Sequence, residues 1–140
     1  MPAEFFLDSN VLVYTFDAAA PAKRKRAREL VRAALETGEG AISWQVAQEV
    51  LNVALHRFER RLTSREAVEY LDEVLLPLCR VFPAPELYRD ALSLQTETGF
   101  RFYDCLILAS AVASGARVLY TEDLQHGRRV RGVTIENPFA

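Results

Sequence analysis

The sequence has few of the features that secreted, membrane-spanning or disulfide-bonded proteins need. Only two cysteines occur, Cys79 and Cys105, each within an apolar stretch. We therefore expect two reduced, buried thiols in a cytoplasmic protein, the alternative being one structural disulfide. No apolar run has the length of a membrane span, and the start, MPAEFFLD, has an acid and no basic signal-peptide region. A formal net charge of −2 gives no bulk basicity of the kind that announces a nucleic-acid binder.

The composition that remains is typical of one globular domain. The chain has 140 residues, of which 50% are hydrophobic and 26% charged, so we expect a single domain over residues 1–140. Short apolar runs alternate with segments of helical periodicity, and this alternation predicts a mainly parallel sheet covered by helices on both faces, a three-layer α/β/α sandwich. The expected strands are 4–8, 41–43, 79–82, 116–121 and 133–136, and the expected helices are 22–38, 44–61, 64–78, 85–98 and 102–115.

Carboxylates follow two of these strands directly. The run FFLD ends on Asp8, and VLYTED ends on Glu122 and Asp123. Parallel sheets bind ligands beyond the carboxyl ends of their strands, where the strand order switches, so we expect Asp8 and Asp123 to be neighbours. Glu49, near the start of one helix, and Asp104, at the start of another, are predicted to join them at the same edge.

A cluster of four carboxylates indicates a cation site. Without a cation the acids would repel one another and their pKa values would rise. Oxygen ligands without cysteine favour Mg²⁺ or Mn²⁺, which can activate water against a phosphodiester. Each acid also has an ordinary structural interpretation: Asp8 and Asp123 as turn formers or helix N-caps, Asp104 as a favourable charge at a helix N-terminus, and Glu49 as a solvated helix residue.

Four segments resemble one known family. FFLDSNVLVY resembles the opening strand of a PIN domain, QEVLNVALHR is similar to its glutamate-bearing helix, and GFRFYDCLILASAVASGARVLYTEDLQHG matches its third and fourth acidic segments in order. The nearest branch is the VapC-type toxins of toxin–antitoxin pairs. The resemblance implies a PIN-like sandwich and an Mg²⁺- or Mn²⁺-dependent endoribonuclease, inhibited by a small cognate antitoxin. It also implies that the metal-binding and catalytic acids are Asp8, Glu49, Asp104 and Asp123.

Three further residues are candidates for substrate binding. Ser9 could contact a metal-bound water or cap the next turn, and Asn10 could brace Asp8 or satisfy loop backbone. Arg101 is the best candidate for a phosphate contact. Glu122 could assist at the metal site or be a solvated neighbour. The basic segments 23–28, 56–61 and 127–131 could hold RNA backbone or be solvated helix faces.

Two other functions stay open. A phospho-receiver domain also binds Mg²⁺ through strand-end acids, but it needs an acidic pair after the first strand and a lysine after the fifth, whereas the only lysines here are Lys23 and Lys25. A PIN-like scaffold that binds RNA without cutting it is opposed by the full set of four acids. We also predict a homodimer, because the 64–78 helix carries more apolar surface than a small sandwich readily covers; core packing within one subunit is the alternative.

Overall fold

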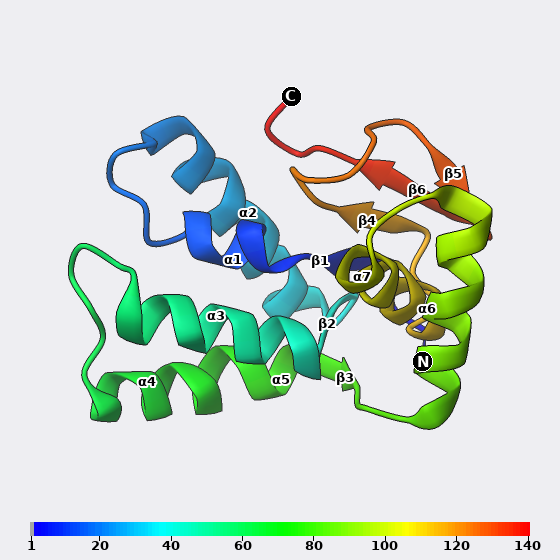
Figure 1. Ribbon diagram of the computed structural model, residues 1–140. Helices are drawn as coiled ribbons and strands as arrows, with labels where there is room; N and C mark the ends of the chain where they lie inside the picture. The colour runs from blue at the N-terminus through cyan, green and yellow to red at the C-terminus, as the bar shows by residue number, and fades with distance from the viewer. Residues whose placement is uncertain (1) are drawn as a thin grey trace.

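The computed structural model describes residues 2–140 and places a six-stranded sheet at the centre of the molecule (Figure 1). The strand order is β3-β2-β1-β4-β6-β5, and every neighbouring pair is parallel except β5 with β6. The strands are β1 (Phe5–Leu7), β2 (Gly40–Ser43), β3 (Cys79–Val81), β4 (Val118–Tyr120), β5 (Arg129–Val130) and β6 (Val133–Glu136). All five predicted strands are confirmed within a few residues.

Helical segments follow the strands and cover the sheet. They are α1 (Ser9–Tyr14), α2 (Pro21–Thr37), α3 (Trp44–His56), α4 (Ser64–Tyr70), the π-helical turn η1 (Leu71–Leu75), α5 (Leu76–Leu78), α6 (Pro85–Thr98) and α7 (Phe102–Ala113). Helices α2, α3 and α7 all pack on β2, whose four residues are all buried. Because alternate side chains of a strand point to opposite faces, β2 is covered on both faces, as the predicted α/β/α sandwich requires.

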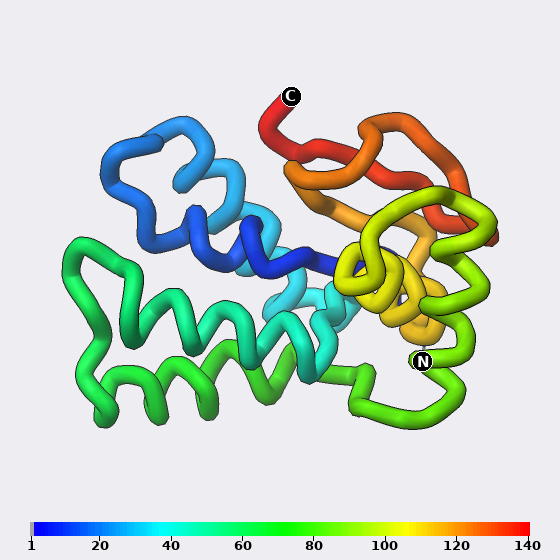
Figure 2. The backbone as a smooth tube through the Cα atoms, in the orientation of Figure 1, coloured from blue at the N-terminus to red at the C-terminus, as the bar shows by residue number. Residues whose placement is uncertain are grey.

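The ends of the helices follow from capping residues. Ser43 accepts a hydrogen bond from Val46 N–H at 3.3 Å and so begins α3 at the end of β2. Thr63 and Glu66 form the predicted capping box at the start of α4. Helix α3 is shorter than the predicted 44–61, because the chain leaves helical geometry at Arg57 and turns towards α4. Figure 2 shows the result: α3 and the α4–η1–α5 segment run in opposite directions, side by side.

The apolar face of the 64–78 segment belongs to the core, so the prediction that this face forms a dimer surface is wrong. Leu75 and Leu78 are 0% and 2% exposed, and Leu71 and Val74 pack against the same core cluster. The segment also contains a π-helical turn: Leu76 N–H bonds to Leu71 O, five residues back, immediately before Pro77, which has no N–H to donate. This face packs within one subunit, whereas Leu76 on the other face is 44% exposed, and the homodimer itself stays a prediction.

Two elements were absent from the sequence-based prediction. Helix α1 follows β1 after a single residue, Asp8, and buries Val11 and Leu12. Strand β5 pairs with β6 through a two-residue turn in which Arg131 and Gly132 have φ values of 48° and 82°. Positive φ at both central residues suits a tight hairpin, but Arg-Gly lacks the Asn-Gly or Asp-Gly signal that reveals such turns.

The two cysteines agree in part with the expectation of buried, reduced thiols, because Cys79 is only partly buried. Cys79 and Cys105 are free thiols, and Cys105 is buried. Across residues 2–140, we find no helix that combines the length and the apolar character needed to cross a bilayer.

Candidate functional site

The candidate site lies where β1 and β4 end. Strand β1 pairs with β2 on one side and with β4 on the other, so the order of strands along the chain switches here. Asp8 is the first residue after β1, and its N–H bonds to Tyr120 O, the last residue of β4, at 3.0 Å. The loop from Thr121 to Asp123 therefore begins beside Asp8, as the topology predicted.

Asp8 is a buried carboxylate held by two neutral donors. Its side chain is 4% exposed. The N–H of Ser9 donates to Oδ1 at 2.7 Å, and the hydroxyl of Thr121 donates to Oδ2 at 2.8 Å. Burial raises the pKa of Asp8 to about 6; the two hydrogen bonds oppose the rise, and the charges of Glu49 and Asp123 add to it. Asp8 is thus the N-cap of α1 and, in the same geometry, an anion that a nearby cation would stabilise.

Ser9 joins the second acid to the first. Its hydroxyl oxygen lies 3.2 Å from Glu49 Oε2 and 3.3 Å from Asp8 Oδ1. A hydroxyl has a single hydrogen to donate, so it bonds one carboxylate at a time and sits between the two. Glu49 itself is exposed on α3. Ser9 thereby fixes the approach of α3 to the end of β1.

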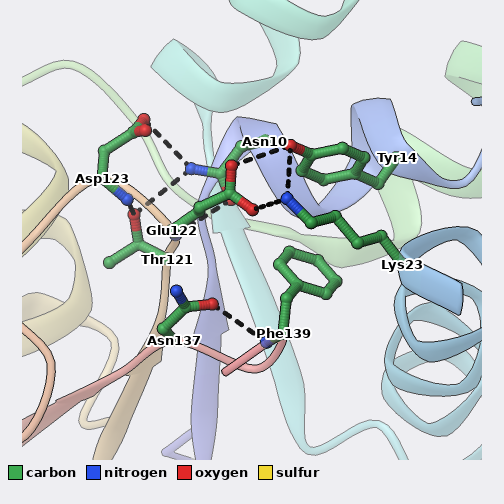
Figure 3. Close-up of polar contacts among 8 residues, drawn as sticks. All are labelled: Asn10, Tyr14, Lys23, Thr121, Glu122, Asp123, Asn137 and Phe139. Carbon is green, nitrogen blue, oxygen red and sulfur yellow. Dashed lines mark hydrogen bonds and ion pairs between the residues drawn. The ribbon is translucent and has the colours of Figure 1, made fainter. Parts of the chain in front are cut away.

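Asn10 and Thr121 hold the third acid. Asn10 Nδ2 donates to Asp123 Oδ2 at 3.1 Å and to Thr121 Oγ1 at 3.3 Å (Figure 3). Thr121 is fully buried, and its oxygen also accepts the N–H of Asp123 at 3.1 Å while it donates to Asp8. One donated and two accepted bonds are the full capacity of a hydroxyl. Thr121 is therefore the central hydrogen-bonding residue of the site, and sequence reasoning did not identify it.

Asp104 approaches from the first turn of α7. Partial burial raises the pKa of Asp104, the charge of Asp123 raises it further, and the charge of Arg101 lowers it. Arg101 is exposed at the N-cap position of α7. Asp104 is therefore close enough to feel the charge of Asp123, and Arg101 is close enough to Asp104 to oppose that effect.

The four acids fit a hard divalent cation in chemistry, although they do not form a closed cage. Within residues 2–140, no three Asp, Glu, His or Cys side chains lie close enough together to hold one ion as they stand. Mg²⁺, however, keeps several waters and is commonly held by one or two carboxylates together with substrate phosphates. The candidate ligand atoms are all oxygen, and burial first, then neighbouring acids, raises the pKa values of Asp8 and Asp104, so a nearby cation would stabilise their charged forms.

Glu122 and the two histidines, His56 and His126, have other surroundings in the structure. Glu122 forms an ion pair with Lys23 at 2.8 Å and its side chain is 27% exposed, so it has a charged partner in addition to solvent. His126, in the loop after Asp123, accepts the N–H of Asn137 at its Nδ1, at 2.9 Å. His56 is exposed at the end of α3.

Known proteins share this arrangement of chain. Residues 5–131 match the family model described as PIN domain. A toxin–antitoxin complex from Klebsiella pneumoniae has a TM-score of 0.68 at 19% identity, covering 96% of this chain and 98% of that chain. DNA-bound VapBC from Salmonella typhimurium has a TM-score of 0.65 at 21% identity, covering 96% and 97%. VapC20 of Mycobacterium tuberculosis, a sarcin–ricin loop cleaving toxin, has a TM-score of 0.60 at 17% identity, covering 86% and 90%. No curated protein matches this chain in sequence.

Proposed function

This chain belongs to the PIN domain family, and on that premise we propose that it is a divalent-metal-dependent endoribonuclease and the toxin of a toxin–antitoxin pair. The observation that carries the proposal is the buried carboxylate of Asp8, whose pKa is raised to about 6 and whose hydrogen-bond partners are both neutral. Such a group is poorly stabilised as an anion unless a cation approaches it.

The four acids have distinct positions around the proposed ion. Asp8, Glu49, Asp104 and Asp123 are the residues that would hold Mg²⁺ or Mn²⁺. When bound, the ion supplies Lewis-acid chemistry, activating water and polarising a phosphate oxygen. Asp8 is buried and held by its two hydrogen bonds, whereas the side chains of Glu49 and Asp123 are exposed and accept side-chain hydrogen bonds from Ser9 and Asn10.

Three neighbours serve these acids and the substrate. The hydrogen bonds of Ser9 and Asn10 favour bracing of the carboxylates over direct RNA contact. Arg101 is exposed beside Asp104, where a guanidinium can pair with the phosphate that is cut. The proposed site therefore has the acids at its centre and the positive charge of Arg101 at its edge.

The partner proteins and the substrate class come from the related structures. One similar structure is described as a toxin–antitoxin complex, another as VapBC bound to DNA, and a third as a toxin that cleaves the sarcin–ricin loop. We propose by analogy a structured RNA as substrate and a small antitoxin as inhibitor. A homodimer stays a prediction, and its interface cannot use the buried face of the 64–78 segment.

One experiment separates the nuclease from a scaffold that only binds RNA. Purified protein is incubated with structured RNA and Mn²⁺, with and without EDTA, beside the variants Asp123→Asn and Asp90→Asn. We expect cleavage that EDTA stops, that Asp123→Asn loses and that Asp90→Asn, an exposed change on α6, retains. RNA binding without cleavage in the presence of Mn²⁺ would refute the proposed nuclease activity.

The toxin half of the proposal needs a separate test in cells. Strong expression of the chain alone in its own host should arrest growth, and Asp123→Asn should relieve the arrest. Co-expression of the adjacent small gene should also relieve it. Normal growth with abundant, folded wild-type protein would refute the toxin role and leave the nuclease chemistry standing.

A further inference from the structure

Glu122 lies in a closed group of polar contacts next to the acids. Its Oε2 accepts a hydrogen bond from Lys23 Nζ at 2.8 Å, and its Oε1 accepts the hydroxyl of Tyr14 at 2.7 Å. Lys23 Nζ also donates to the Tyr14 oxygen at 3.2 Å, which closes a triangle (Figure 3). These three residues and Phe139 form what we term the Lys23 cluster. It joins α1, α2 and the loop after β4.

Aromatic rings flank the ammonium group in this cluster. Lys23 Nζ lies 4.8 Å from the centre of the Tyr14 ring and 5.8 Å from the centre of the Phe139 ring, within the range of cation–π attraction. The two rings meet edge to face at 4.9 Å. The side chains of Lys23 and Glu122 are 40% and 27% exposed, so the ion pair alone would contribute little to stability. The arrangement of the Lys23 cluster is nevertheless well fixed, because each of its four residues contacts at least two of the others.

The cluster reaches the acids through the backbone of Glu122. The Glu122 N–H donates to Asn10 Oδ1 at 3.3 Å. This bond decides which way round the Asn10 amide lies: with Oδ1 taken by the N–H, Nδ2 must face Asp123. If the amide turned over, its oxygen would point at the Asp123 carboxylate, and two acceptors would face each other.

We propose that Lys23 and Glu122 are a positioning pair for the nuclease reaction: by anchoring the loop after β4 they orient Asn10 and so place Asp123. The inference rests on the proposed function. It assigns Glu122 neither to the metal nor to solvent, and it assigns Lys23 to the loop and not to RNA. Loss of either charge should leave the core intact while Asp123 moves.

Charge reversal tests the pair. The variants Lys23→Glu, Glu122→Lys and the double reversal are compared for Mn²⁺-dependent cleavage of one RNA, with separate kcat and KM. We expect each single reversal to lower kcat by roughly tenfold to a hundredfold, which is the usual effect of losing a residue that hydrogen-bonds to a metal-binding side chain. The double reversal should restore most of the lost kcat. The same reversals of the exposed Arg65–Glu69 pair on α4, 3.7 Å apart, are the matched control and should leave kcat unchanged.

Each alternative role predicts a different result. If Lys23 contacted phosphate, Lys23→Glu would mainly raise KM and Glu122→Lys would not rescue it. If Glu122 bound the ion, the double reversal would stay inactive. Either result would overturn the positioning role. Where a reversal does not fold, Lys23→Met and Glu122→Gln replace it, and each must lower kcat without lowering Tm by more than the control does.

A second readout keeps this inference separable from the nuclease proposal. If the wild-type protein cuts no RNA, the proposed function fails, but the side-chain amide NMR signals of Asn10 still report its orientation. These signals should shift in each single reversal and return in the double reversal. Unchanged signals in both single variants would refute the inference whatever the activity.

Discussion

Replacing Asp8 by Asn should make the protein more stable at neutral pH, although it removes a residue proposed to be essential. The folded-state pKa of Asp8 is about 6, against 3.8 for an ordinary aspartate. Below pH 3.8 the group is protonated in both the folded and the unfolded states, so ionisation adds no cost. As the pH rises from 3.8 to 6 the unfolded chain releases this proton first, and stability falls. Above pH 6 the full penalty is present, about 3 kcal/mol for two pKa units at roughly 1.4 kcal/mol each.

The hydrogen bonds of Asp8 reduce the gain that Asn can bring. Asn keeps an oxygen for the Ser9 N–H, but its Nδ2 would face the Thr121 hydroxyl, whose oxygen already accepts from Asn10 and from the Asp123 N–H. A buried donor without a partner costs about 1–3 kcal/mol. We therefore expect a net gain of about 0–2 kcal/mol near pH 7.5, and no gain or a small loss near pH 4.5, where wild-type Asp8 is protonated in the folded state.

Urea unfolding at the two pH values, with and without Mn²⁺, measures this difference. Asp90→Asn, an exposed change on α6, controls for general loss of negative charge. Added Mn²⁺ should stabilise the wild-type protein more than Asp8→Asn, because a ligand stabilises the state that binds it. An equal effect of Asp8→Asn at both pH values, or a loss near pH 7.5, would refute the assignment of Asp8 as an uncompensated buried anion.

Three further predictions concern the other parts of the site and the fold. Asp104→Asn should abolish RNA cleavage, because it removes one of the acids proposed to hold the ion. Its circular dichroism spectrum should be unchanged, because the change only removes one like charge from beside Asp123, and near wild-type cleavage by the folded variant would contradict this. Because the pKa of Asp8 is raised to about 6, protons should compete with Mn²⁺ for this carboxylate at lower pH, and the raised pKa of Asp104 acts in the same direction. Calorimetric titration should therefore give weaker Mn²⁺ affinity near pH 5 than near pH 7.5. Thr63→Ala should lower the free energy of unfolding by about 1 kcal/mol through loss of the capping box, with cleavage unaffected, and a change in kcat would show that α4 matters to the site.

The sequence was sufficient to locate Asp8 and Asp123 because both follow apolar runs whose ends meet at a switch in strand order. It was not sufficient to identify Thr121. A lone threonine after a strand has no periodic signal, and its importance depends on groups from α1 that lie more than 100 positions away in the chain. The same holds for Lys23 and Glu122, which read as surface charges until the fold brings them to 2.8 Å.

The misassigned face of the 64–78 segment has a different cause. Helical periodicity reveals which residues share a face, and Leu71, Val74, Leu75 and Leu78 do lie in or against one core cluster. It does not reveal whether that face meets the core of its own subunit or the surface of another. The PIN resemblance, by contrast, depended on four acids in order, and the family match over residues 5–131 confirms it.

The dependence of the loop after β4 on β6 has a consequence for newly made copies of the chain. Thr121 N–H bonds to Glu136 O at 3.0 Å, and β4 is paired along its length with β6. During synthesis, Asp8 and Glu49 leave the ribosome long before residue 136 has been added, so a nascent chain carries two of the acids without the loop that places Asp123. Domains generally fold as units once their residues are available. While it is being made, a protein proposed to cut RNA therefore lies close to its own messenger RNA without its four acids in place. An inhibitor can bind before the site is complete only if it binds before β6 pairs with β4.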